Sequence, residues 1–320
     1  MAGGPFRSAR TPGAPRASAP MSFSRALLVS LRPHQWTKNL VVLAALAFSK
    51  HLFDGDAVVR AGMAFATFCG LSGAVYLVND LVDVERDRLH PLKRARPIAS
   101  GALPVSRARA AAVCLLALGL LAAWGLGRGF FACALSYLVL NLAYSFALKA
   151  VVILDVLSIA IGFVVRAVGG ALAIQVVFSD WLLVCTILLA LFLALAKRRH
   201  ELATLENAAG HRLALAEYSP YLLDQMIRVV TASCLTAYAF YTLAPETIEK
   251  YRTDRLALTI PFVIYGIFRY LYLVHRREQG GSPSDVLLTD WPLLAAVALW
   301  ATAVVLIVYT APGIPVPRGH

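Results

Sequence analysis

The residues best suited to chemistry lie between positions 79 and 87, in the segment NDLVDVERD. Asp83 and Asp87 are four residues apart, so on a helix their carboxylates share one face, and Asn79 falls on that face one turn earlier. Acidic groups at the mouth of a membrane helix are costly unless something compensates them. A hard divalent cation such as Mg²⁺ would do so, and it commonly shares its shell with substrate phosphates. The alternative is a solvated helix end in which Asp and Arg pair across turns.

Basic side chains able to bind phosphate occur at several places along the chain. Arginine offers phosphate a planar fork of donors, and lysine offers a point charge. The candidates are Lys38, Lys93, Arg94, Arg96, Lys149, Arg166, Lys197 and Arg198, with Asp80 and Tyr144 as further polar groups of the same stretches. Cations at helix ends also complement the helix dipole or contact lipid head groups, which is the alternative explanation. Acids and cations together are what a magnesium-bound diphosphate compound would require.

Two ionisable residues lie inside an apolar stretch. Asp155 is about one turn into the expected span 151–173, and Arg166 is about three turns deeper; their offset of eleven returns Arg166 near the same helix face. A charge within a membrane helix is a functional candidate by default, although an arginine paired to a carboxylate purely for packing is the alternative. Gly162, Gly169 and Gly170 would permit close approach of a neighbouring helix.

The elements that must position these groups are membrane helices. The 320 residues are 59% hydrophobic and only 15% charged, with a mean hydropathy of +0.69. Several apolar runs reach the roughly 18 to 20 residues needed to span hydrocarbon, and they do not alternate as β-barrel strands do. The fold class is therefore all-α, a polytopic membrane bundle of about nine transmembrane helices. The expected spans are about 39–53, 57–78, 108–126, 129–148, 151–173, 181–197, 225–245, 256–274 and 291–310.

The net charge of +12 is concentrated in short loops between the apolar runs. Among the loops that join the spans, those after even-numbered spans hold most of the lysines and arginines, which places them and the N terminus in the cytoplasm. The two longest of these loops, 79–107 and 198–224, would cap one end of the helices. We therefore expect an integral protein of the inner (cytoplasmic) membrane whose active site faces the cytoplasm. This charge distribution argues against nucleic acid as a partner.

The remaining features carry less information. Residues 1–21 are rich in Gly, Pro, Ala, Ser and Arg and are expected to form a disordered tail, which leaves 22–320 as a single transmembrane domain. All five cysteines lie in apolar stretches without a CxxC pair, so we expect small buried hydrophobic groups. The oligomeric state stays open.

The acidic segment resembles the NDxxDxxxD signature of the UbiA superfamily of intramembrane prenyltransferases, over about residues 30 to 310. Five stretches are similar to the decaprenyl-phosphate phosphoribosyltransferase branch of that superfamily: RPHQWTKN at 32–39, KRARP at 93–97, 144–155, 162–166 and Lys197-Arg198. Aromatic prenyltransferases of the superfamily usually carry a second aspartate-rich motif, DxxxD. Here Asp155 is followed by VLSI, so the second acid is missing.

The resemblance implies a UbiA-like bundle and a Mg²⁺-dependent transferase. Its reaction would move 5-phosphoribose from phosphoribosyl pyrophosphate to a polyprenyl (decaprenyl-type) phosphate in the membrane and release pyrophosphate. Asn79, Asp83 and Asp87 would hold Mg²⁺, and the cations named above would bind the phosphates. Asp155 is a further catalytic candidate that would orient a cation or contact the ribose. The alternatives are prenyl transfer to an aromatic or porphyrin acceptor and, remotely, a membrane transporter.

Overall fold

A computed structural model of the chain describes residues 21–91, 93–204, 213–276 and 283–310. Every regular element in these ranges is a helix, as the apolar pattern predicts. The first half contains α1 (Phe23–Leu31), the 3₁₀ helix η1 (Pro33–Leu43), α2 (Ala44–Phe48), α3 (Gly55–Val82), α4 (Val84–Leu89), η2 (Lys93–Ala95), α5 (Val105–Leu126), α6 (Arg128–Phe146) and η3 (Leu148–Ala150). The second half contains α7 (Leu154–Ala173), α8 (Asp180–Thr204), α10 (Leu213–Ala216), α11 (Pro220–Leu243), α12 (Pro245–Tyr251), η4 (Arg255–Thr259), α13 (Ile260–Arg276), α14 (Pro283–Thr289) and α15 (Trp291–Thr310).

Eight helices in the described ranges are long and apolar enough to cross a membrane. They correspond to the second to ninth expected spans, so the protein is a polytopic membrane protein. The first expected span, 39–53, differs: the chain there forms η1 and the short α2, and a turn follows from residue 49. A helix pattern broken in this way gives a membrane segment no continuous ladder of i→i−4 hydrogen bonds, so neighbouring helices must support it.

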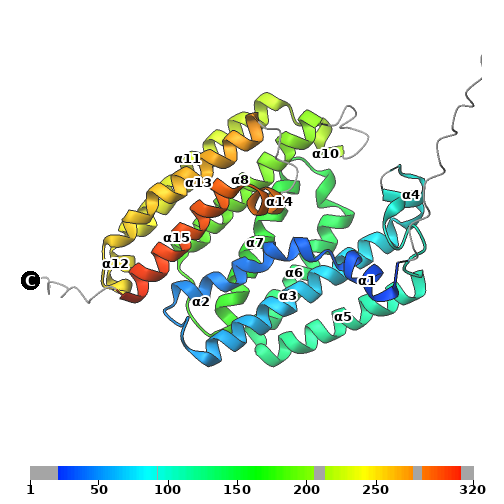
Figure 1. Ribbon diagram of the computed structural model, residues 1–320, viewed down its shortest axis with the longest axis horizontal. Coiled ribbons are helices and arrows are strands. Elements are labelled where there is room, and N and C mark those ends of the chain that lie inside the picture. The colour runs from blue at the N-terminus through cyan, green and yellow to red at the C-terminus, as the bar shows by residue number, and fades with distance from the viewer. Residues whose placement is uncertain (1–20, 92, 205–212, 277–282, 311–320) are drawn as a thin grey trace, which may run out of the picture.

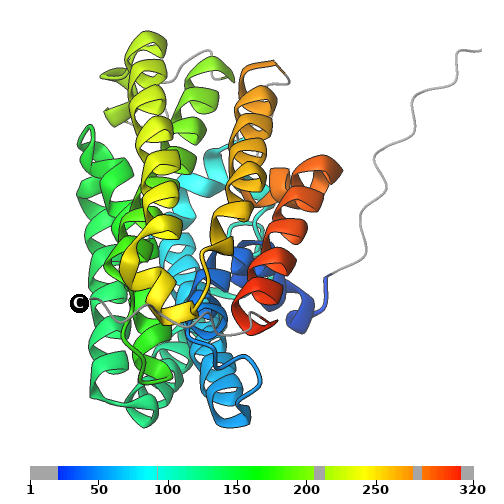
Figure 2. The same cartoon turned by 90° about the vertical axis from the view of Figure 1, so that its left-hand side faces the viewer.

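The long helices form two groups with α7 between them (Figure 1). In one group α3 packs against α5, and α6 packs against α7; in the other α8 packs against α7 and α11, and α13 packs against α15. The turned view in Figure 2 shows the long helices of both groups running roughly side by side. Two apolar clusters fill these groups, one around Phe68 and Phe130 and the other around Phe192 and Leu195. Helix α7 therefore connects the two halves of the molecule.

A glycine explains how η1 reaches α7. A Cβ atom on Gly170 would lie 2.0 Å from the carbonyl oxygen of Val42, so only glycine permits this approach. The contact places η1 against the buried face of α7 and beside α3. The 3₁₀ helix begins after Arg32, whose φ of 53° turns the chain out of α1. Lys38 and Asn39 of η1 are thereby positioned between α3 and α7.

The expected cytoplasmic cap is built mostly from short elements. Segment 79–107 contains the end of α3, then α4, η2 and the first turn of α5. Of segment 198–224, residues 198–204 extend α8, residues 205–212 lie outside the described ranges, and α10 leads to α11. Ser219 ends this loop because its hydroxyl accepts a hydrogen bond from the backbone N–H of Leu222 and caps α11. Of the predicted tail over residues 1–21, residues 1–20 also lie outside the described ranges.

Candidate functional site

The acidic segment folds as a helix end with one interruption. Helix α3 ends at Val82, Asp83 caps it, and α4 begins at Val84. Asp80 and Asp87 are both buried, and one Nη1 of Arg96 contacts both carboxylates, at 3.1 and 2.7 Å. Arg32 adds a second ion pair to Asp80 at 2.7 Å. We call Arg32, Asp80, Asp83, Asp87 and Arg96 the acid cluster.

The acid cluster differs from the expected ligand set in one respect. The residue that shares a partner with Asp87 is Asp80, one position after the predicted Asn79, because Arg96 lies against both the end of α3 and α4. Asp83 is the most open acid: its side chain is 37% exposed, and its ion pair with Arg86 is long at 3.9 Å. No group of three or more His, Cys, Asp or Glu side chains within the described ranges is arranged to hold a metal ion.

The donor chemistry at this helix end nevertheless suits a hard cation. Asp83 and Asp87 provide carboxylate oxygens and Asn79 an amide oxygen, which is the ligand type that Mg²⁺ prefers. Asp87 contacts Arg96 through Oδ2, and its Oδ1 makes no hydrogen bond to any residue that the structure describes. The half-exposed Asp83 and this free oxygen of Asp87 fit a bound cation without loss of the Arg96 contact.

The basic residues that follow the acid cluster divide by exposure. Lys93 and Arg94 are exposed on η2, whereas Arg96 is partly buried by its two ion pairs. Lys149 on η3 is half-buried, and within the described parts of the chain it makes no hydrogen bond or ion pair. The structure therefore brings Arg96 into contact with Asp80 and Asp87, whereas Lys149 contacts no acidic side chain among the described residues.

A set of cations lies beside the acid cluster, and Lys38 is at its centre. The cations that act electrostatically on Lys38 are Lys197 from α8, Arg166 from α7 and Arg32 from the acid cluster. Burial, and then these three charges in that order, lower the pKa of Lys38 to about 7, and Asp285 of α14 opposes the shift. Lys38, Arg166 and Lys197, three of the cations named from the sequence, thus lie within electrostatic range of one another and of Arg32 in the acid cluster.

Arg166 is held rigidly within this set. Its Nη1 donates to the side-chain oxygen of Asn39 at 3.1 Å, and its Nε donates to the carbonyl of Gly162 at 3.0 Å. Its guanidinium also lies over the rings of Phe163 and Tyr137, at 4.4 and 5.3 Å from their centroids. The partner of this intramembrane arginine is therefore an amide and two aromatic rings rather than a carboxylate.

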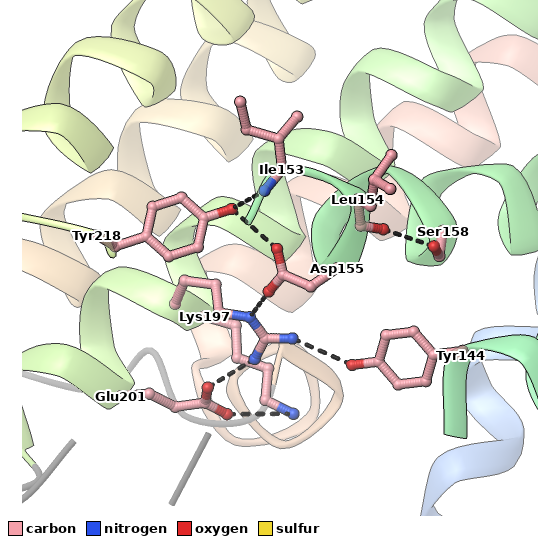
Figure 3. Close-up of polar contacts among 9 residues, drawn as sticks. Tyr144, Ile153, Leu154, Asp155, Ser158, Lys197, Glu201 and Tyr218 are labelled. Carbon is pink, nitrogen blue, oxygen red and sulfur yellow. Dashed lines mark hydrogen bonds and ion pairs between the residues drawn. The ribbon is translucent and has the colours of Figure 1, made fainter. Parts of the chain in front are cut away.

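A second polar network joins the start of α7 to the end of α8. Arg198 donates from Nε to Asp155 at 2.6 Å, from Nη1 to Glu201 at 2.6 Å and from Nη2 to the hydroxyl of Tyr144 at 3.2 Å. Figure 3 shows these contacts converging beside Asp155, with Lys197 reaching the same Glu201. Asp155 is 0% and Arg198 1% exposed. We call Tyr144, Asp155, Arg198, Glu201 and Tyr218 the Asp155 network.

Tyr218 completes this network from the segment before α11. Its hydroxyl donates to Oδ1 of Asp155 at 2.8 Å and accepts from the backbone N–H of Ile153 at 2.8 Å (Figure 3). Ile153 has a φ of 69°, which is unusual for a β-branched residue. Burial raises the pKa of the Tyr218 hydroxyl. The bond to Ile153 therefore supports a strained turn that starts α7 at Leu154 and aims Asp155 at Arg198.

Sequence reasoning missed four members of these clusters as site residues. Arg32 stands in the quoted RPHQWTKN stretch and Glu201 follows Arg198 by three residues, a spacing that brings side chains together on a helix. Asn39 is also within the quoted stretch, next to the candidate Lys38, and this position was its signal in the sequence. Tyr218 has no local signal, because only the fold places residue 218 beside residues 153 and 155.

Fold and site together describe an integral membrane protein with its ionisable groups gathered where several helices end. The family model described as "UbiA prenyltransferase family" matches residues 39–286. A decaprenyl-phosphate phosphoribosyltransferase from Corynebacterium glutamicum is 34% identical, covering 92% of this chain and 90% of that protein. One of the same name from Mycolicibacterium smegmatis is 32% identical over 89% of this chain and 93% of that protein.

Solved structures agree with the fold. A UbiA homologue from Archaeoglobus fulgidus, bound to GPP and Mg²⁺, superposes with a TM-score of 0.68 at 20% identity, covering 88% of this chain and 99% of that one. At this identity the likeness shows the fold alone. The chain belongs to the UbiA prenyltransferase family, and it is a membrane-embedded transferase.

Proposed function

We propose that the protein transfers a 5-phosphoribosyl group from phosphoribosyl pyrophosphate to a polyprenyl phosphate of the decaprenyl type and releases pyrophosphate. The two relatives named decaprenyl-phosphate phosphoribosyltransferase support this, because each is matched over about nine-tenths of its length. We further propose that residues 22–320 form one domain in the inner membrane and that the site faces the cytoplasm. The basic loops at that end of the helices favour this orientation.

The observation that carries the proposal is that the two acidic regions differ in accessibility. Asp83 is open, whereas both oxygens of Asp155 are bonded and out of contact with solvent. One open acidic region beside several cations suits one metal-bound pyrophosphate and one further phosphate. A pair of open acidic regions would suit a prenyl diphosphate donor better.

The acid cluster would receive the donor. Asn79, Asp83 and Asp87 would hold Mg²⁺, which when bound supplies positive charge to the pyrophosphate oxygens. Lys93 and Arg94 are exposed at the entrance and would attract the same group, while Arg96 fixes Asp80 and Asp87. Fixed charges of this kind stabilise a leaving group without reorganising at the moment of reaction.

The acceptor phosphate would lie against Lys38, Arg166 and Lys197. Its oxygen attacks C1 of the ribose as the bond from C1 to the pyrophosphate oxygen breaks. The apolar chain of the acceptor extends into the lipid between helices.

The sequence allows two roles for Asp155, orienting a cation or contacting the ribose. Its contact with Arg198 supports the first role. Tyr144 and Arg198 then act by holding the ends of α6, α7 and α8 together. Lys149 is a further candidate phosphate contact at this end.

The test uses the purified full chain in lipid nanodiscs with Mg²⁺, phosphoribosyl pyrophosphate labelled in the ribose, and decaprenyl phosphate. The expected result is a labelled lipid and one equivalent of pyrophosphate. A parallel reaction supplies geranyl diphosphate with 4-hydroxybenzoate. A prenylated aromatic product without labelled lipid would contradict the proposal and favour the prenyl-transfer alternative.

A further inference from the structure

Lys38 is surrounded by cations but has no partner of its own. Arg32 is paired with Asp80, Arg166 with the side chain of Asn39, and Lys197 with Glu201. Lys38 makes no hydrogen bond or ion pair with any residue in the described ranges, although it is half-buried. Within the described ranges Lys38 is therefore the cation of the set whose charged form no hydrogen bond or ion pair stabilises.

The charged groups that act on Lys38 come from three helices and from the residue that precedes η1. They are Lys197 of α8, Arg166 of α7, Arg32 before η1 and Asp285 of α14. A lysine in water has a pKa of about 10.4. Here burial and the three cations outweigh the single acid and lower the pKa of Lys38 to about 7. Near neutral pH a large share of the Lys38 amines is therefore uncharged and carries a lone pair.

A phosphate monoester entering the same place also titrates near neutrality, because its second pKa is about 6. Three cations would favour its fully ionised form, and that form in turn would favour an ammonium at Lys38. Binding of the phosphate therefore favours protonation of Lys38, and protonation of Lys38 favours binding of the phosphate.

We propose that Lys38 is the proton acceptor for the lipid substrate, taking the P–OH proton of the polyprenyl phosphate as that phosphate enters the site. This inference rests on the proposed function. The phosphate O–H bond breaks and its electron pair stays on oxygen, while an N–H bond forms at Nζ. That oxygen then forms the bond to C1 of the ribose, and the electron pair of the broken C1–O bond leaves with pyrophosphate. The new ammonium remains between the two phosphate groups and balances their charge.

The first test measures proton uptake. Farnesyl phosphate is bound to the full chain in detergent at pH 8, without donor, by calorimetry in buffers of different ionisation enthalpy. At this pH the ligand is a dianion, so wild type should take up about one proton from solvent. Lys38→Arg keeps a permanent charge and should take up none. Lys250→Arg is the matched control, because burial also lowers the pKa of Lys250. This lysine lies on α12, outside the set of cations around Lys38, so proton uptake should persist in the variant.

The second test measures kcat/KM for phosphoribosyl transfer against pH. For wild type, kcat/KM should fall by up to about tenfold per pH unit above pH 7. Lys38 and the lipid phosphate are then both deprotonated, so a proton must come from solvent. Lys38→Arg should lack this alkaline decline. Equal proton uptake in wild type and Lys38→Arg, or no binding of farnesyl phosphate to folded wild type, would overturn the inference. Uptake that depends on Lys38 without any transfer would uphold Lys38 as the acceptor and reject the proposed function.

Discussion

The acid cluster and the Asp155 network use the same residue types and are built in opposite ways. In the acid cluster one arginine, 30% exposed, is shared between two carboxylates while a third carboxylate stays open. In the Asp155 network one arginine has three partners and the carboxylate has two, and both are sealed from solvent. Carboxylate–arginine contacts alone therefore do not identify a binding site.

What separates the two regions is whether a group has unused bonding capacity. A buried ion pair that is fully hydrogen-bonded has no capacity left for a ligand, and breaking it leaves a buried charge. An open carboxylate can bind a cation without disturbing the fold. We therefore assign ligand binding to the acid cluster and positioning to the Asp155 network. Three variants test this assignment, and a fourth tests the burial of Lys38.

Asp83→Asn should have the largest effect on the reaction. The change removes one charge from the proposed magnesium site, and loss of one such interaction typically costs about 10²- to 10³-fold in rate. Stability should barely change, because the one side-chain contact of Asp83 among the described residues is a long ion pair to the exposed Arg86. Initial rates of phosphoribosyl transfer check this. Asp56→Asn, an exposed carboxylate at the other end of α3, is the control, and a rate for Asp83→Asn within about twofold of it would reject the assignment.

Asp155→Ala should have the largest effect on stability. It leaves the buried guanidinium of Arg198 without the carboxylate that paired with it, and such a loss typically costs about 3–5 kcal/mol. Unfolding in detergent, followed by circular dichroism, measures the change. Asp155→Ala combined with Arg198→Met should recover much of the loss, since the unpaired charge is gone. A stable but inactive Asp155→Ala protein would instead mean that Asp155 acts on substrate.

Tyr218→Phe should have a smaller effect on stability of the same sign. The change removes two hydrogen bonds, one to Asp155 and one from the N–H of Ile153, at an expected cost of about 1–2 kcal/mol. The same unfolding measurement applies. Tyr221→Phe, an exposed tyrosine at the start of α11, should be neutral. Equal stability of the two variants would show that the strained turn at Ile153 does not depend on Tyr218.

Lys38→Met should produce an effect of the opposite sign, a pH-dependent gain in stability. The pKa of Lys38 is lower in the folded chain than in the unfolded one, so between about 7 and 10.4 the unfolded state binds more protons. Wild-type stability then rises with pH through this window relative to the variant. The advantage of Lys38→Met should be greatest at pH 7 and below and disappear toward pH 10, as melting temperatures would show. Lys93→Met, at an exposed site, should show no such trend, and a parallel trend in both would contradict the burial of Lys38.

Sequence reasoning anticipated much of this arrangement where local pattern decides. The apolar runs predicted nine spans, and eight of them correspond to long helices in the described ranges. The first, 39–53, does not, because η1 (Pro33–Leu43) and the short α2 replace a long α-helix there. The need for glycine on α7 was also predicted, and it holds at Gly170. Lys149 and Asn79 show the limit, since their types suit phosphate and metal but the described structure gives neither a polar side-chain contact.

The order of apolar and charged residues by itself determined a helical membrane protein with acids and cations at the ends of particular helices, because hydrocarbon thickness and the cost of charge in lipid act on sequence directly. Only the tertiary structure decided which acid meets which cation. Asp80 and Asp87 meet at Arg96, Asp155 is sealed by Arg198 and Tyr218, and Lys38 has no hydrogen-bond or ion-pair partner among the residues that the structure describes. The reason is that pairing depends on which helix ends adjoin, and contacts between residues tens or hundreds of positions apart are set by packing rather than by local spacing.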